Sequence, residues 1–242
     1  MARIHLAEFL LHLLLFTGTL MTATSLKLLD VQIPRTVKEG EAVRLTCAYD
    51  LGGELPYSTT WTKNGGVFYQ STQSGGKLSP FSGADVNVAE SDQFSVLLEQ
   101  LTLHSGGAYR CEVVTEAPTF EVVTGDEILN VTAPPKEGPK IRGAQTHYNI
   151  GDTVDIACVS LGSRPVVNYS WYLNGLPPDP TNSEISNLAT PTVEGLDSSV
   201  SRLRFKISDD LFINGTVSIK CVASIPNVYI GSDEKVVHQR YD

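Results

Sequence analysis

The chain has 242 residues, 41% hydrophobic and 19% charged, so it can build a packed core and is not a disordered tail. Its net charge of −9 argues against nucleic-acid and heparin binders, because such proteins need a basic surface. Only five histidines are present, and two of them lie in the first twelve residues, which leaves few candidates for metal or acid–base chemistry.

Residues 1–25 have the layout of a secretory signal peptide. Arg3 precedes a short apolar run, residues 9–16, and small or hydroxylated residues close the segment. The run falls short of the roughly 20 apolar residues that a membrane span needs, which makes an uncleaved anchor the weaker alternative. Cleavage after Ser25 suits the small residues there, and cleavage after Ala23 is nearly as good. We therefore expect a protein that is secreted or displayed on the extracellular face of the plasma membrane, and the C-terminal residues show no membrane tether.

Four cysteines, Cys47, Cys111, Cys158 and Cys221, fall into two nearly equal intervals of 64 and 63 residues. Equal intervals in an exported chain indicate a repeated unit with its own disulfide in each copy. No pair has the close spacing of a zinc site, so we expect no metal here. On the chain-entropy model, each disulfide stabilises its domain by about 4 kcal/mol.

The same pattern surrounds each pair of cysteines. Trp61 follows Cys47 by fourteen residues, and Tyr109 stands two residues before Cys111. This arrangement is typical of an immunoglobulin β-sandwich, in which the tryptophan packs on the disulfide and the tyrosine hydroxyl bonds back to the backbone. In the second repeat Trp171 keeps its place, whereas Ile219 stands where the tyrosine would be.

The sequence therefore predicts an all-β fold with two tandem immunoglobulin-like β-sandwiches. We expect domain 1 at residues 26–133, a proline-rich linker at 134–139 and domain 2 at 140–242. Domain 1 is expected to be variable-type, because residues 64–92 have room for extra strands. Domain 2 is expected to be constant- or intermediate-type, with a loop-like middle at residues 176–196. The expected strands B, C, C′, E, F and G of domain 1 are 41–49, 58–63, 66–71, 93–101, 108–115 and 119–131.

Several longer segments carry a family resemblance. Domain 1 reads CAYDLGGELPYSTTWTKNGGVFYQ and then GGAYRCEVVTEAPTF, and domain 2 reads ACVSLGSRPVVNYSWYLNG. Together these segments resemble the beaten path (Beat) family of neuronal immunoglobulin-superfamily proteins, across the whole mature chain. The EAP-x-F and SRP-x-x-N-x-S-W segments are the more specific ones. Family members usually have a more basic turn where this chain has Asn64-Gly65-Gly66.

The resemblance implies a recognition protein of axon guidance and cell adhesion. It implies a protein partner, namely a sidestep-family-like immunoglobulin protein of the cell surface, bound by the sheet face of the outermost domain. A generic immunoglobulin-superfamily adhesion receptor, homophilic or immune-type, is the alternative.

Strand alternation predicts the same face independently, as the C–C′–F–G sheet of domain 1. Because Trp61 points inward, Thr60 and Thr62 are expected to point outward. By the same alternation around Tyr109 and Cys111, the expected outward residues of strand F are Arg110, Glu112 and Val114.

Three aromatic residues are candidates for the anchor of this face. Phe68 and Tyr69 are consecutive on one strand, so one ring is expected to face out beside Val114 as a binding hot spot. The alternative places that ring under the C″ loop. Phe120, at the start of strand G, is either part of the face or a core residue.

Three glycosylation sequons begin at Asn130, Asn168 and Asn214. Asn168 is expected to face out and to shield the corresponding sheet of domain 2, whereas the C–C′–F–G face of domain 1 is expected to have no sequon. Domain 1, taken as residues 26–134, has 7 basic and 14 acidic side chains and a net charge of −7. That excess either steers a basic partner or only keeps the surface solvated.

Enzymes and ligand carriers are the competing classes. Every cysteine is expected to be paired, the mature histidines have no patterned partners, and no catalytic motif is present. A sandwich core is filled by side chains and leaves little room for a ligand. We therefore expect no catalytic residues, cofactor, small-molecule substrate or nucleic-acid partner.

Overall fold

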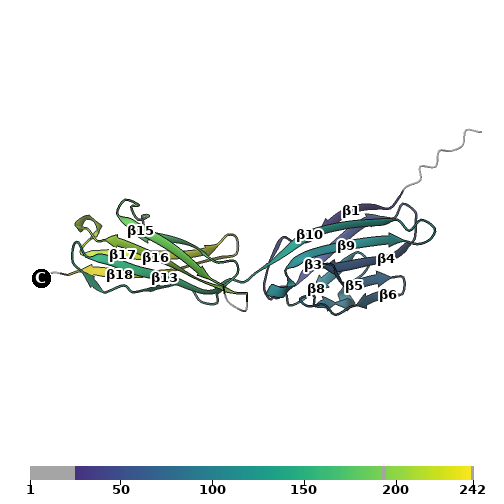
Figure 1. Cartoon of the computed structure of the whole chain (residues 1–242), viewed down its shortest axis with the longest axis horizontal. Helices are drawn as coiled ribbons and strands as arrows, with labels where there is room; N and C mark the ends of the chain where they lie inside the picture. Colours follow the sequence, from purple (N-terminus) through teal and green to yellow (C-terminus); the bar gives the residue numbers. More distant parts are fainter. Residues whose placement is uncertain (1–24, 192–194, 241–242) are drawn as a thin grey trace, which may run out of the picture.

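The computed structural model describes residues 25–191 and 195–240. Figure 1 shows two β-sandwiches placed end to end, with β10 leading from the first toward the second. The expected signal peptide, residues 1–25, lies outside the described residues except for Ser25. The described part of the chain contains no helix long and apolar enough to cross a membrane.

The first sandwich packs a four-stranded sheet, ordered β1-β3-β8-β7, against a six-stranded sheet, ordered β2-β10-β9-β4-β5-β6. Strands β6 and β7 and the short 3-10 turn η1 occupy the stretch that the sequence left for extra strands. The strands are β1 Lys27–Gln32, β2 Thr36–Lys38, β3 Val43–Asp50, β4 Pro56–Lys63, β5 Gly66–Thr72, β6 Gly75–Leu78, β7 Val86–Asn87, β8 Ser95–Leu98, β9 Gly107–Thr115 and β10 Val122–Thr132. The 3-10 turns are η1 Val88–Glu90 and η2 Leu103–Ser105.

The core of the first sandwich lies between these sheets. The Cys47–Cys111 disulfide joins β3 of one sheet to β9 of the other. Trp61 and Tyr109 are fully buried beside it. Burial alternates along β3 with a period of two, because one face of the strand packs inward and the other meets water.

The second sandwich packs sheet β11-β13-β16-β15 against sheet β12-β18-β17-β14. Its disulfide joins Cys158 on β13 to Cys221 on β17, so both bonds follow the pairing that the spacing predicts. The strands are β11 Lys140–Arg142, β12 His147–Tyr148, β13 Thr153–Ser163, β14 Asn168–Leu173, β15 Ser183–Thr190, β16 Asp197–Lys206, β17 Thr216–Ile225 and β18 Tyr229–Gln239. A 3-10 turn, η3 Asp209–Leu211, precedes β17.

The middle of domain 2 differs from the loop that the sequence predicts. Strand β15 pairs with β16 in antiparallel register along its whole length. It lies at the edge of its sheet, and all but one of its side chains are exposed. An edge strand with both faces wet has no period-two apolar pattern, which is why its sequence resembles a loop.

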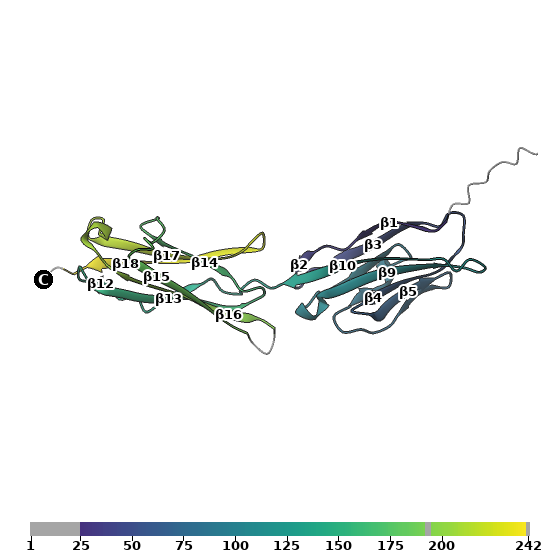
Figure 2. The same cartoon turned by 45° about the horizontal axis from the view of Figure 1, so that its top comes forward.

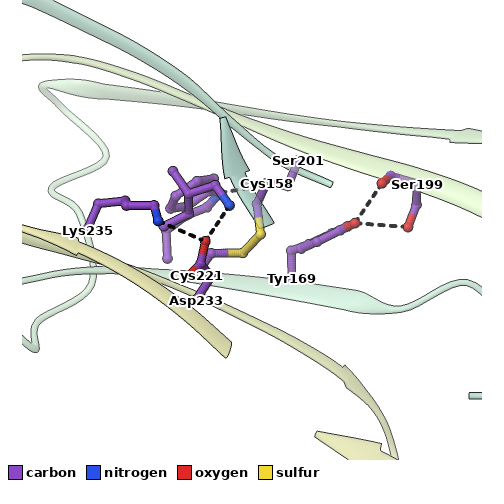
Figure 3. Close-up of a disulfide and its surroundings, with 9 residues drawn as sticks. Cys158, Tyr169, Ser199, Ser201, Cys221, Asp233 and Lys235 are labelled. Atoms are coloured by element: carbon purple, nitrogen blue, oxygen red, sulfur yellow. Dashed lines mark hydrogen bonds and ion pairs between the residues drawn. A yellow bond between two sulfur atoms is a disulfide. The ribbon is translucent and has the colours of Figure 1, made fainter. Parts of the chain in front are cut away.

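Near the second disulfide, two serines of β16 accept hydrogen bonds from the polar groups of two aromatic side chains (Figure 3). The indole Nε1 of Trp171 donates to Ser201 Oγ at 2.9 Å, and the Tyr169 hydroxyl donates to the Ser199 carbonyl at 2.7 Å. Ile219, at the position of the missing tyrosine, is fully buried among apolar neighbours.

The connection between the sandwiches is hydrogen-bonded to domain 2. Ala133 and Arg164 exchange two backbone hydrogen bonds, of 2.8 and 2.7 Å, in an isolated antiparallel bridge. Because β10 ends at this connection, its first residues lie at the opposite end of the first sandwich, far from the second (Figures 1 and 2).

Candidate functional site

Strands β4, β9 and β10 lie side by side in the six-stranded sheet (Figure 2), and their register aligns residues in rows across its outer face. In the row nearest the free end, Val114 lies opposite Ser58 and Val122. The next row places Glu112 opposite Thr60 and Thr124, and the third places Arg110 opposite Thr62 and Asp126. The register therefore brings the five expected outward residues of β4 and β9 onto one face.

These residues are not equally accessible. Thr60 is only 8% exposed, because Gln70 on β5 covers it and donates from Nε2 to its hydroxyl at 3.3 Å. Thr62, Glu112 and Val114 are partly exposed. The exposed Arg110 forms a 3.5 Å ion pair with Asp126, a surface contact that contributes little to stability. Thr60 thus supports the face from beneath and offers almost no surface of its own.

The expected aromatic anchor on β5 is wrong. Phe68 and Tyr69 are both buried, with exposed fractions of 0% and 1%. The pairing of β4 with β5 shifts at this point: Trp61 pairs with Tyr69, and Thr62 pairs with Val67. Phe68 is therefore the extra residue of a β-bulge, which interrupts the alternation and lets two consecutive side chains point inward.

Each buried ring has a defined neighbour. Phe68 meets Tyr109 edge to face, with ring centroids 5.8 Å apart. Tyr69 lies against β6, where a Cβ on Gly76 would overlap its hydroxyl group. Both rings point inward, so the alternative of an outward ring under the C″ loop does not hold either. The outward positions of β5 belong to Val67 and Gln70, which pair with Thr62 and Thr60.

Phe120 is exposed and is not a core residue. It lies in the β9–β10 loop, before β10 begins at Val122, and 59% of its surface is accessible. Its backbone φ of +47° is in the left-handed region, which a bulky aromatic residue rarely adopts and which costs on the order of 1–3 kcal/mol. The loop therefore holds this ring in solvent at an energetic cost.

Phe120 is one of four exposed apolar side chains at the free end of domain 1, which we call the apolar tip. Its members are Leu55, Tyr57, Phe120 and Val122, with exposed fractions of 60%, 56%, 59% and 54%. Two loops bring them together, since Glu116 N donates to the Leu55 carbonyl at 2.9 Å. Three of the four were not among the expected site residues. For two of them the sequence offered a signal, since Leu55 and Tyr57 are apolar residues on either side of Pro56, just before the expected strand C.

Carboxylates surround the apolar tip. Glu54 accepts a hydrogen bond from the Thr119 hydroxyl at 3.3 Å, and Glu116 accepts one from Gln73 Nε2 at 2.9 Å. Glu121 accepts one from the backbone nitrogen of Leu26 at 2.7 Å. The site is thus an apolar surface with an acidic rim.

The three sequons lie at exposed asparagines, but one of them corrects the expected glycan-free face. Asn130 follows Ile128 on β10 by two residues and shares its outward direction. The C–C′–F–G sheet therefore does carry a sequon, because β10 extends along the whole sheet. At about 3.3 Å per residue, Asn130 lies about 26 Å from Val122, at the end nearer domain 2. Asn168 faces outward on β14, and Asn214 lies in the turn before β17.

The comparisons with known proteins agree with this architecture. Residues 34–121 match the family model of the immunoglobulin domain. The first sandwich is therefore immunoglobulin-like over these residues. A curated relative, cell adhesion molecule 2 of Xenopus tropicalis, is 25% identical over 139 residues, which cover 57% of this chain and 30% of that protein. This chain thus spans less than a third of that relative.

Solved structures show the same fold for the tandem pair. The crystal structure of Rst D1-D2 superposes with a TM-score of 0.67 at 20% identity, covering 89% of this chain and all of that one. Immunoglobulin domains 1–5 of Sidekick-1 give a TM-score of 0.57 at 19% identity, covering 92% of this chain and 40% of that one. The fold is therefore two tandem immunoglobulin-like sandwiches.

Proposed function

We propose that this chain is the extracellular recognition part of a cell-adhesion protein, and that domain 1 binds a protein partner. The contact surface consists of the apolar tip and the adjoining rows of the C–C′–F–G sheet. In this proposal the chain is a binding protein of the cell exterior, not an enzyme.

The apolar tip carries the proposal. Contiguous exposed apolar side chains on a soluble protein mark interaction surfaces, and aromatic side chains dominate the binding energy of such surfaces. Phe120 is both exposed and aromatic, and its backbone is strained. Folded proteins keep such strain mainly at functional sites. The acidic rim around it fits a partner with basic residues beside an apolar pocket.

The likeness to beaten path proteins supports a more specific assignment. The specific segment EAP-x-F lies in the β9–β10 loop, and SRP-x-x-N-x-S-W runs from the end of β13 into β14. On this basis the partner is a sidestep-like immunoglobulin protein, and the setting is axon guidance. The second candidate is a generic adhesion receptor that binds itself or another receptor, which the relationship to cell adhesion molecule 2 favours.

A binding screen tests both candidates. The secreted two-domain chain, multimerised to raise its avidity, is incubated with a panel of cell-surface ectodomains that includes sidestep-family members and the chain itself. Binding to a sidestep-like ectodomain supports the first candidate, and self-binding supports the second. If no ectodomain in a broad panel binds, the recognition function is wrong.

Variants then locate the surface. Phe120→Ala should weaken binding by at least tenfold, since it removes an exposed aromatic ring. Ile230→Ala, a change at a 77% exposed apolar residue on β18, is the control and should leave binding unchanged. Glu112→Lys should slow association and change its salt dependence. Parent-like affinity in Phe120→Ala, Tyr57→Ala and Val122→Ala together would exclude the apolar tip.

A further inference from the structure

The first buried residue of the described chain contacts the recognition loop. Leu26 is 6% exposed and packs into the core of domain 1, whereas Ser25 before it is exposed. The backbone nitrogen of Leu26 donates to Glu121 Oε2 at 2.7 Å. This contact joins the start of β1 to the base of the β9–β10 loop, at the free end of the first sandwich.

We propose that the mature chain begins at Leu26 and that its α-ammonium group forms an ion pair with Glu121. A secretory-pathway peptidase hydrolyses the Ser25–Leu26 amide. The water oxygen bonds to the Ser25 carbonyl carbon as the C–N bond breaks, so Ser25 ends as a carboxylate. Both protons of the water end on the Leu26 nitrogen, which keeps its own hydrogen and becomes an ammonium. The nitrogen that donates to Glu121 as a neutral amide before cleavage thus carries a positive charge afterwards.

The surroundings of Glu121 favour this charge. Within the part of the chain that the structure describes, no lysine or arginine forms an ion pair with Glu121. Two further carboxylates, of Glu54 and Glu116, belong to the same pair of loops. An α-amino group titrates at about pH 7.7–8.0, so it is largely charged at neutral pH.

Glu121 connects the Leu26 contact to the loop that carries Phe120 of the apolar tip. Its backbone nitrogen donates to Thr115 Oγ1 at 2.8 Å, and Thr115 N donates back to the Glu121 carbonyl at 3.0 Å. These bonds close the loop that holds Phe120, the residue directly before Glu121. On this proposal, removal of the leader adds a positive charge beside the loop that holds the Phe120 ring.

The position of the first residue is the first test. Intact-mass measurement and N-terminal sequencing of the secreted two-domain protein should show a chain that starts at Leu26. A chain that starts at Thr24, as cleavage after Ala23 would produce, would keep a neutral amide at Leu26 and would overturn the proposal.

A double-variant cycle tests the ion pair itself. One variant carries an added Gly-Ser before Leu26, which moves the ammonium group away and leaves a neutral amide at Leu26. The other variant is Glu121→Gln. Each should lower the melting temperature by about 1–5 °C, and the two together should lower it no further than either alone. Glu39→Gln, a change at an exposed residue of domain 1, is the control and should show no coupling to the extension.

Additive losses in this cycle, or no loss from either change, would show that the contact carries no charge-dependent energy. Because mass and stability are measured without a partner, both tests stand whether or not the proposed function is correct.

Discussion

The phenolic hydroxyl of Tyr109 donates a hydrogen bond to the backbone carbonyl oxygen of Ser105 at 2.7 Å, and both residues are buried. This bond joins β9 to η2, four residues earlier in the chain, and closes the corner that the Tyr-x-Cys pattern predicts.

Tyr109→Phe should destabilise domain 1 by about 1–3 kcal/mol, because it leaves a buried carbonyl without its donor. The thermal melting temperature of the two-domain chain measures the effect. Tyr57→Phe is the matched control, because Tyr57 is 56% exposed and its hydroxyl can bond to water. Equal melting temperatures for Tyr109→Phe and the parent would show that the corner bond contributes nothing.

The same residue predicts a loss of stability at high pH. Burial raises the pKa of Tyr109 above its ordinary value of about 10. Below pH 10 the phenol is neutral in both states and its contribution is fully present. Above about pH 10 only the unfolded chain ionises, so the stability falls as pH rises. Chemical denaturation at about pH 9 and about pH 11 should show a smaller loss in Tyr109→Phe than in the parent, although other buried tyrosines add a shared loss in both.

The bulge in β5 predicts opposite results for two neighbouring residues. Phe68→Ala should cost about 3–5 kcal/mol, because it opens a cavity beside Tyr109. Val67→Ala, at a residue that is 44% exposed, should change the free energy of unfolding by about 0.5 kcal/mol or less. Denaturant titration of both variants measures this difference. If Phe68→Ala changed the free energy of unfolding only slightly, the Phe68 ring would have to lie in solvent, and Phe68 would again be a candidate anchor.

The hydrogen bond between Trp171 and Ser201 predicts a loss in domain 2. Ser201→Ala should cost about 1–3 kcal/mol, because the buried indole nitrogen then has no acceptor. Ser186→Ala, on the neighbouring strand β15, is exposed and should be neutral. Calorimetry of the two-domain chain compares the variants. A neutral Ser201→Ala would mean that another acceptor or water replaces the hydroxyl.

Local and repeated signals determined much of the architecture. The matched cysteine intervals, the tryptophan after each first cysteine and the period-two strands predicted two disulfide-bonded sandwiches, because each signal depends on residues that must share one core. Alternation also placed Arg110, Glu112 and Val114 on one outer face, since β9 runs through all three residues without interruption.

Tertiary structure decided what alternation could not. The bulge at Phe68, opposite Trp61 and Thr62, depends on how β4 and β5 pair, so the sequence of β5 alone did not show that Phe68 and Tyr69 both point inward. The edge strand β15 has almost no buried side chains to produce a pattern. The apolar tip and the contact from Leu26 to Glu121 join segments about 60 to 95 residues apart. The pairing of β4 with β9 brings the segments of the apolar tip together, and the packing of the two sheets brings Leu26 to Glu121.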